Sequence, residues 1–169
     1  MNDANPSPML RLRGCFPRPG RVEWIGLRPR REQEMEVLAS VLAVPGRGLE
    51  GDRYRGSRGV REVSLIQSEH LPVIARLAGL DEVLPSVLRR NILVSGVNLS
   101  ALIGRSFRIG DALLHGTGAC HPCSRMEAAL GPGGYNAMRG HGGITARVVE
   151  QGGIAVGDAL IATPSRESL

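Results

Sequence analysis

The apolar residues of this chain come in short runs separated by glycine-rich turns, and this spacing restricts its fold more than any other feature. The 169 residues include 23 glycines, and the apolar runs between them have the length of ordinary strands, about four to eight residues. Aromatic residues make up only 3% of the chain, so valine, isoleucine, leucine and alanine must build the core. The pattern predicts one mostly β domain with a few short helices and a mixed, largely antiparallel, barrel-like sheet.

The same reading places the individual elements. Helices are expected at 69–78, with Ser68 as N-cap, at 81–88, and at 124–130. The segment 146–163 predicts a last hairpin-like unit. Strands are expected at 21–27, 34–44, 62–67, 91–95, 106–109 and 112–116.

Charge divides the chain into an arm, a body and a tail. Residues 1–31 hold seven arginines and two acids, whereas the remaining 14 arginines balance 14 acids. We expect a flexible basic arm over 1–20, a folded domain over 21–162 and a polar tail over 163–169. A basic arm can meet nucleic acid, but the few aromatic residues of this one make a solvated leader the preferred interpretation.

Composition also excludes some classes of protein. No apolar run has the length of a membrane helix, about 18 residues, and no secretory signal is evident, so a cytoplasmic protein is expected. All 21 basic residues are arginine. Without a lysine, the chain cannot hold pyridoxal phosphate as an internal aldimine, so covalent pyridoxal catalysis is excluded.

Two cysteines three positions apart, Cys120 and Cys123, mark the candidate reactive site. His121 lies between them and Arg125 follows, at the junction of an expected strand and helix, where a helix start and a guanidinium favour thiolate over thiol. The residues allow a dithiol redox pair, a zinc site with a histidine, a single reactive or metal-ligating thiolate at Cys123, or two inert buried cysteines. Catalytic roles are therefore predicted for Cys123, Cys120, His121 and Arg125, with Cys123 as the metal ligand.

Three further segments have the composition of ligand-binding sites. Arg89, Arg90 and Asn91 combine two guanidiniums and an amide, which suits a phosphate or another oxyanion. The glycines of the loop 48–53 allow either close approach to a ligand or a tight turn. His141 is framed by glycines and could orient a ligand or transfer a proton. A solvated helix end and a loop histidine without a role are the plain alternatives.

These segments belong to an ordered series. Its members are 48–56, 61–66, 89–96, 98–99, 104–111, 120–125, 140–143, 146–147 and 157–158. In this order, across roughly 21–162, they resemble the MOSC domain, found at the C-terminus of molybdenum cofactor sulfurase and in small standalone bacterial proteins. The resemblance implies a β-barrel of the pyruvate-kinase barrel-like type.

The resemblance also implies a function. Family members that reduce N-hydroxylated compounds hold the molybdenum cofactor (Mo-molybdopterin) through a cysteine that corresponds to Cys123, and basic and polar groups hold its phosphate. The matching positions are Arg89 and Asn91, with neighbouring Arg90, together with Arg53 and either Arg28 or Arg30. The chain departs from those reductases at 61–62, where they carry small hydroxyl residues.

Two biochemical functions follow from the resemblance. The first is a molybdenum-dependent reductase that takes electrons from an external electron-donor protein and acts on a small-molecule substrate. The second is a sulfur carrier that receives sulfur from a cysteine desulfurase as a Cys123 persulfide. A nucleic-acid-binding accessory protein that acts through the arm is a third and less favoured class, and no membrane partner is expected.

Overall fold

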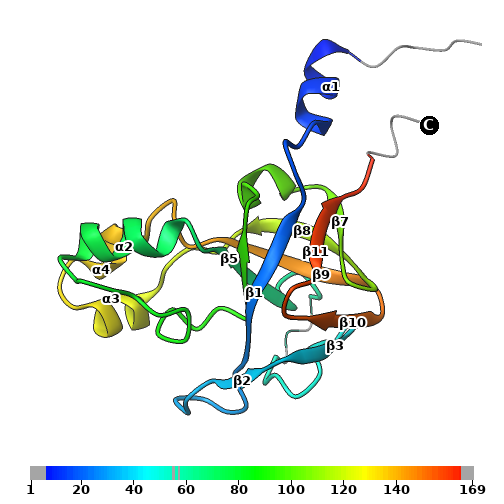
Figure 1. Cartoon of the computed structure of the whole chain (residues 1–169). Coiled ribbons are helices and arrows are strands. Elements are labelled where there is room, and N and C mark those ends of the chain that lie inside the picture. Colours follow the sequence, from blue (N-terminus) through cyan, green and yellow to red (C-terminus); the bar gives the residue numbers. More distant parts are fainter. Residues whose placement is uncertain (1–6, 55, 57, 165–169) are drawn as a thin grey trace, which may run out of the picture.

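The strands close into a barrel, and most of the helices form a layer against one side of it (Figure 1). The computed structural model describes residues 7–54, 56 and 58–164. Within these residues, seven strands form a ring in the order β1, β11, β7, β8, β9, β5, β6 and back to β1. Their bounds are β1 Gly20–Leu27, β5 Val63–Gln67, β6 Ile92–Ser95, β7 Ser106–Ile109, β8 Ala112–Ala119, β9 Ile144–Glu150 and β11 Ala159–Ala162.

Pairing in the ring is antiparallel except between β5 and β6, which run parallel. The predicted mixed, largely antiparallel barrel is therefore confirmed. A short strand, β2 (Glu36–Leu38), extends the sheet from β1. A second sheet has the order β10, β3, β4. Its strands are β3 Ser40–Val44, β4 Gly48–Leu49 and β10 Gly152–Ala155.

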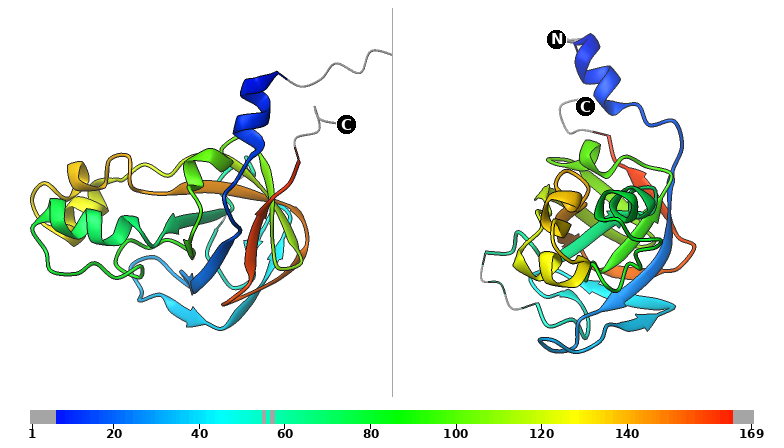
Figure 2. Two further views of the ribbon diagram at one scale, coloured as in Figure 1. Left: turned by 45° about the horizontal axis from the view of Figure 1, so that its top comes forward. Right: turned by 90° about the vertical axis from the view of Figure 1, so that its left-hand side faces the viewer.

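Helices pack on one side of the barrel, as the two views of Figure 2 show. They are α2 His70–Ala78, α3 Ser124–Leu130 and α4 Gly134–Met138. A short 3₁₀ helix, η1 (Leu99–Leu102), follows β6. Strand β5 is buried along its whole length because it is covered on both faces: Leu65 belongs to the barrel core, whereas Ile66 belongs to the cluster beneath the helices. No described helix is long and apolar enough to cross a membrane.

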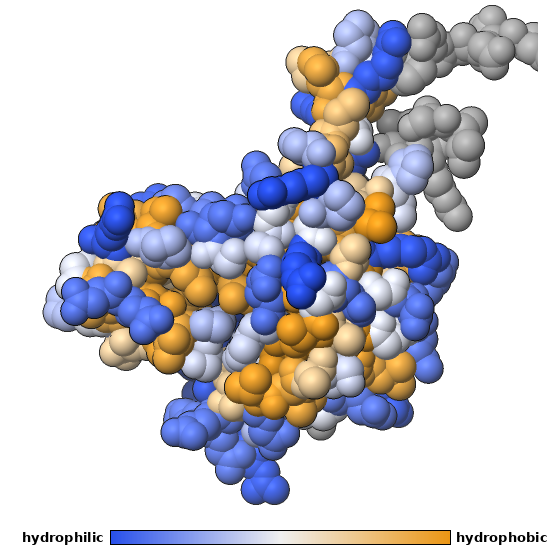
Figure 3. Space-filling model, viewed as in Figure 1, coloured by the Kyte–Doolittle hydropathy of each residue, from blue (hydrophilic) through white to orange (hydrophobic). Residues whose placement is uncertain are grey.

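The N-terminal helix α1 (Pro8–Gly14) stands away from the body of the molecule. Ser7 caps it by accepting a hydrogen bond from the Leu10 N–H, and Pro8 occupies its first turn, where a proline costs no hydrogen bond. Met9 and Leu12 remain mostly exposed, and the hydropathy view shows apolar surface on this projecting helix (Figure 3). The sequence analysis predicted no regular structure within 1–20, so α1 is a difference from that prediction.

Three further expectations differ from the structure. The segment 34–44 is two strands, because the chain leaves β1 and joins β10 at Ala39, whose carbonyl accepts from the Val156 N–H. The segment 81–88 forms turns, since Pro85 lacks an N–H and disfavours a helical residue before it. Glu69, not Ser68, is the N-cap of α2.

Candidate functional site

The registers of the barrel bring several strand ends to one rim. Ile25, near the end of β1, pairs with Ile92 at the start of β6. The same Ile92 pairs with Leu65 of β5, which pairs with Ile144 at the start of β9. Ile144 in turn pairs with Ala119, the last residue of β8. Residues just beyond these ends, far apart in sequence, therefore lie at one rim.

The cysteine loop leaves this rim after β8. The Cys120 N–H donates to the Gly143 carbonyl at 2.8 Å, and Cys120 itself is buried. Cys123 is exposed and is the N-cap residue of α3, where its carbonyl accepts from the Met126 N–H. All three cysteines of the chain are free thiols. The loop thus presents one accessible thiol, that of Cys123, at a fixed position.

Buried Arg90 holds the cysteine loop in place. Its Nε donates to the Gly142 carbonyl at 2.8 Å, Nη1 to the Leu88 carbonyl at 2.9 Å, and Nη2 to the Cys120 carbonyl at 3.3 Å. Burial lowers the pKa of Arg90, and the nearby Cys120 and Cys123 oppose that shift. Because its donors serve backbone carbonyls, Arg90 positions the loop rather than offering a fork of donors to a ligand.

Asn91 is a second buried positioning residue. Its Oδ1 accepts from the Ser64 N–H and hydroxyl and from Arg28 Nη2. Its Nδ2 donates to the Gly26 carbonyl and to Asp52 Oδ1. Since both Oδ1 and Nδ2 of Asn91 already have hydrogen-bond partners, Asn91 positions Arg28 and Asp52 and has no free group for a ligand.

Arg28 and Asp52 form a buried ion pair next to Asn91. Arg28 Nη2 lies 2.7 Å from Asp52 Oδ2, Nε lies 3.1 Å from Oδ1, and the Arg28 N–H also donates to Oδ1. Burial alone would raise the pKa of Asp52, but hydrogen bonds and charge from Arg28, with the Asn91 amide, outweigh it and hold the pKa below its ordinary value. The carboxylate is therefore ionised and fixes the Arg28 guanidinium at the rim.

Three further arginines gather around this ion pair. Burial lowers the pKa of Arg89, and the positive charges of Arg53, Arg28 and Arg125 lower it further. Arg89 also has a left-handed backbone, φ +53°, and its Nη1 donates to the Gln33 carbonyl at 2.7 Å. Such backbone strain is commonest at functional sites.

Two nitrogens of the arginine cluster (Arg28, Arg53, Arg89 and Arg125) lack partners. Within the described residues, Arg53 Nε and Arg89 Nη2 are buried and have no hydrogen-bond acceptor. Buried N–H groups in native proteins nearly always have acceptors. With Asp52 as the single acid among the groups that shift the pKa of Arg89, the cluster is built to receive an anion.

Neither of the two predicted site histidines, His121 and His141, has a described contact with the arginine cluster. His121 is exposed. His141 packs edge-on against His70 of α2, with ring centroids 5.0 Å apart, and its buried Nδ1 has no hydrogen-bond partner among residues 7–54, 56 and 58–164. Burial and the charge of His141 lower the pKa of His70. Arg30, the alternative to Arg28, is exposed, so Arg28 is the arginine that the rim holds.

Two residues of the rim, Asp52 and Ser64, were not predicted from the sequence. Asp52 lies in the glycine loop that was singled out, but nothing in that loop's composition identified a partner 24 positions away. Gly48 of the same loop has φ +76°, and an added Cβ there would overlap the Glu62 carbonyl. Close approach to the backbone just before β5, not to a ligand, accounts for that glycine.

The described residues contain no group of three or more histidine, cysteine, aspartate or glutamate side chains that could hold a metal ion. The assignment of Cys123 as a metal ligand stays a prediction. Thiolate is a soft ligand, the kind that binds Cu(I), zinc and iron–sulfur clusters.

The barrel, the cysteine loop and the arginines at its rim define the class. The model of the MOSC domain matches residues 52–161, and the chain belongs to this family. A comparison with curated proteins gave no match.

Solved structures share the fold. YuaD from Bacillus subtilis is 20% identical with a TM-score of 0.76, over 88% of this chain and 98% of that one. YiiM from Geobacillus stearothermophilus is 19% identical, with a TM-score of 0.69 over 86% and 75% of the two chains. YiiM from Escherichia coli is 21% identical, with a TM-score of 0.65 over 86% and 70%.

Proposed function

We propose that this chain binds the molybdenum cofactor, with the Cys123 thiolate as a ligand of molybdenum, and reduces N-hydroxylated compounds. One observation carries the proposal. An exposed thiol lies within electrostatic reach of buried Arg90, beside a cluster of arginines in which two buried nitrogens have no acceptor in the part of the chain that the structure describes. MOSC domains are associated with molybdenum cofactor binding in general, and this donor set fits that group.

The arginines divide into two roles. Arg53 and Arg89 would donate to the phosphate of the pterin, because each has a buried nitrogen without an acceptor. Arg125, on α3, adds positive charge close to Arg89. Arg28 contributes charge as well, but Asp52 and Asn91 already accept from its guanidinium, so it is held as part of the wall.

Arg90 and Asn91 would act as positioning residues. Arg90 ties Cys120 and Gly142 together, which fixes where the loop presents Cys123. Asn91 fixes the Arg28–Asp52 pair. His121 is exposed two residues before Cys123 and is available to the substrate side of the site.

When bound, the cofactor would supply a two-electron reduction that removes the oxygen of the N-hydroxyl group. The chain shows no flavin, haem or iron–sulfur motif, so we assign electron delivery to a separate donor protein. The test is reduction of benzamidoxime by cofactor-loaded protein with a chemical electron donor. Turnover is expected for the wild type and for Cys15→Ala, which removes an exposed thiol outside the site, and loss is expected for Cys123→Ala. Absence of turnover in loaded wild-type protein would rule out the reductase.

The free, exposed state of Cys123 and the nearby free thiol of Cys120 support a second candidate, a sulfur carrier. The Cys123 thiolate would attack the outer sulfur of a desulfurase persulfide, so that the desulfurase thiol leaves and Cys123 carries the persulfide. Attack by Cys120 on the inner sulfur would release hydrosulfide and form a Cys120–Cys123 disulfide. Persulfide labelling after incubation with a cysteine desulfurase tests this, and an unlabelled Cys123 would exclude it.

A further inference from the structure

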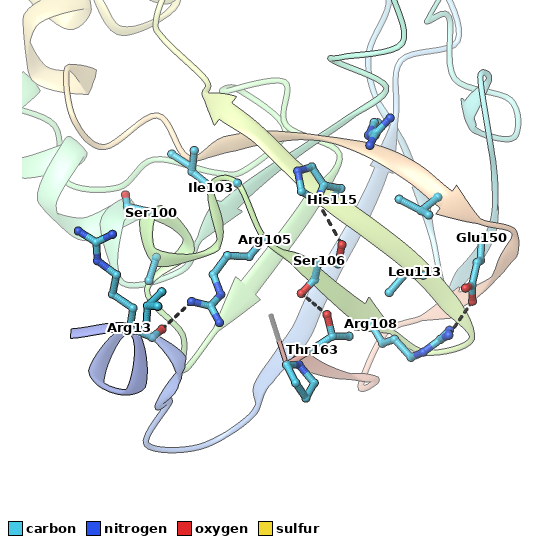
Figure 4. Close-up of a pocket in the computed structure, with 16 residues that line it drawn as sticks. Arg13, Ser100, Ile103, Arg105, Ser106, Arg108, Leu113, His115, Glu150 and Thr163 are labelled. Carbon is cyan, nitrogen blue, oxygen red and sulfur yellow. Dashed lines mark hydrogen bonds and ion pairs between the residues drawn. The ribbon is translucent and has the colours of Figure 1, made fainter. Parts of the chain in front are cut away.

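A groove on the outer face of the barrel lies apart from the cysteine rim. It has a volume of about 960 Å³, and its walls are the strands β7, β8 and β9, the region of η1, and the helix α1. None of its lining residues belongs to the arginine cluster or the cysteine loop. Figure 4 shows the strand residues Ser106, Arg108, Leu113 and His115, with Arg13 of α1 and Ile103 after η1 to one side of them. The volume is in the range of small-molecule sites, about 300–1,000 Å³.

The groove carries an excess of positive charge. Its lining includes four arginines and one acid, Glu150. Arg108 Nη2 lies 2.6 Å from Glu150 Oε2, so the charges of these two side chains offset each other. Arg105 Nη1 donates to the Arg13 carbonyl at 2.9 Å, and its guanidinium lies over the Phe16 ring, so these contacts tie the C-terminal end of α1 to the barrel. The lining residues therefore carry a net charge of +3, to which Arg13 and Arg147 each contribute one positive charge.

A row of polar groups crosses the floor of the groove. Ser106 pairs with His115 across β7 and β8, and His115 pairs with Arg147 across β8 and β9. The Ser106 hydroxyl and His115 Nδ1 are 3.2 Å apart. Burial and the charge of Arg147 lower the pKa of His115. A hydroxyl, a neutral imidazole and a guanidinium in one row suit the head group of an anion.

Apolar side chains complete the walls. Leu113 and Val149 lie on the strands, Ile103 follows η1, and Leu10 comes from α1. Ile103 and Val149 are 39% and 42% exposed, so an apolar group in the groove would remove part of their surface from water. A fully polar ligand such as inorganic phosphate would leave this surface in water.

We propose that the groove binds an organic anion, a small molecule with a phosphate or carboxylate head and an apolar body. The head lies on the row formed by Ser106, His115 and Arg147, and the body lies against Ile103 and Leu10, on the α1 side of that row. The basic arm thereby has a definite role, since α1 is one wall of the site. The proposal does not depend on a cofactor at Cys123.

Calorimetric titration of the full chain with octyl phosphate, octanoate, inorganic phosphate and the neutral compound octanol tests the proposal. Saturable one-to-one binding of octyl phosphate or octanoate is expected, and the preferred one identifies the head group. Inorganic phosphate and octanol are expected to bind at least about tenfold more weakly, because each lacks half of the contacts.

Variants locate the binding. Arg147→Gln and Leu10→Asp should each weaken it about tenfold or more. Arg47→Gln, at an exposed turn between β3 and β4, should leave it unchanged. Three results would overturn the proposal: no saturable binding of either octyl anion, equal binding by Arg147→Gln, or binding of a hexaglutamate peptide in place of both, which would indicate an acidic protein partner.

Discussion

At the scale of single residues, the site depends on side chains whose surroundings fix them before any ligand arrives. Asp52 and Asn91 hold Arg28, and backbone carbonyls hold Arg90. Arg53 and Arg89 instead each keep a buried nitrogen that has no acceptor among the described residues. We infer that Arg28 and Arg90 stabilise the fold. The unsatisfied nitrogens of Arg53 and Arg89 instead lower its stability and are kept for binding a ligand.

Asp52→Asn should lower the free energy of unfolding by about 3 kcal/mol at pH 7, because it leaves the largely buried Arg28 guanidinium without its counter-charge. The folded-state pKa of Asp52 is lowered, so its contribution is present above the unfolded pKa, about 3.9, and is lost as pH falls through the folded pKa. Urea unfolding of wild type and variant should therefore converge in acid. Asp81→Asn, at an exposed carboxylate, is the control, and an equal effect at both positions would contradict the ion pair.

Arg89 adopts φ +53°, a conformation that costs a residue with a Cβ about 1 kcal/mol or more. Arg89→Gly and Arg89→Ala both remove the guanidinium, but only glycine relieves the strain. The glycine variant should be about 1 kcal/mol more stable than the alanine variant in urea unfolding. Both should lose affinity for the cofactor. Equal stability of the two variants would show that this backbone is not left-handed.

At the scale of elements, most strands could be predicted from the sequence, because runs such as 62–67 and 91–95 have the length and composition of buried strands. It also located the cysteine loop and the arginine pair at 89–90. It did not separate β2 from β3, since that break depends on which sheet each half joins. Nor did it distinguish Arg90 from Arg89: the two are adjacent, and only the positions of the Gly142 and Cys120 carbonyls make one of them a positioning residue.

The start of β9 needs a glycine for close packing. Gly143 has φ +82°, and an added Cβ would overlap the Leu65 carbonyl. Gly140 has a similar φ, +80°, but no heavy atom lies within 4 Å of the added Cβ. Gly140→Ala should therefore cost only about 1 kcal/mol, whereas Gly143→Ala should cost at least about 3 kcal/mol and lower the yield of folded protein. Thermal unfolding of the pair compares them, and similar midpoints would contradict the packing of β5 against β9.

At the scale of the whole molecule, the closed barrel turns distant sequence positions into one site. The end of β1, the loop after β4, the approach to β6 and the loop after β8 supply Arg28, Arg53, Arg89 and Cys123 in turn. No one of these segments contains the site, which is why each motif is weak alone. The same barrel presents a second basic surface on its outer face, walled by the N-terminal helix.

The central claim is that Cys123 holds molybdenum at the arginine-lined rim. The most direct test is the molybdenum content per chain, measured by plasma mass spectrometry on protein purified from a host that makes the cofactor. Wild type and Cys15→Ala should carry nearly stoichiometric metal, and Cys123→Ala should carry almost none. Absence of molybdenum from the wild type, or equal content in Cys123→Ala, would contradict the claim.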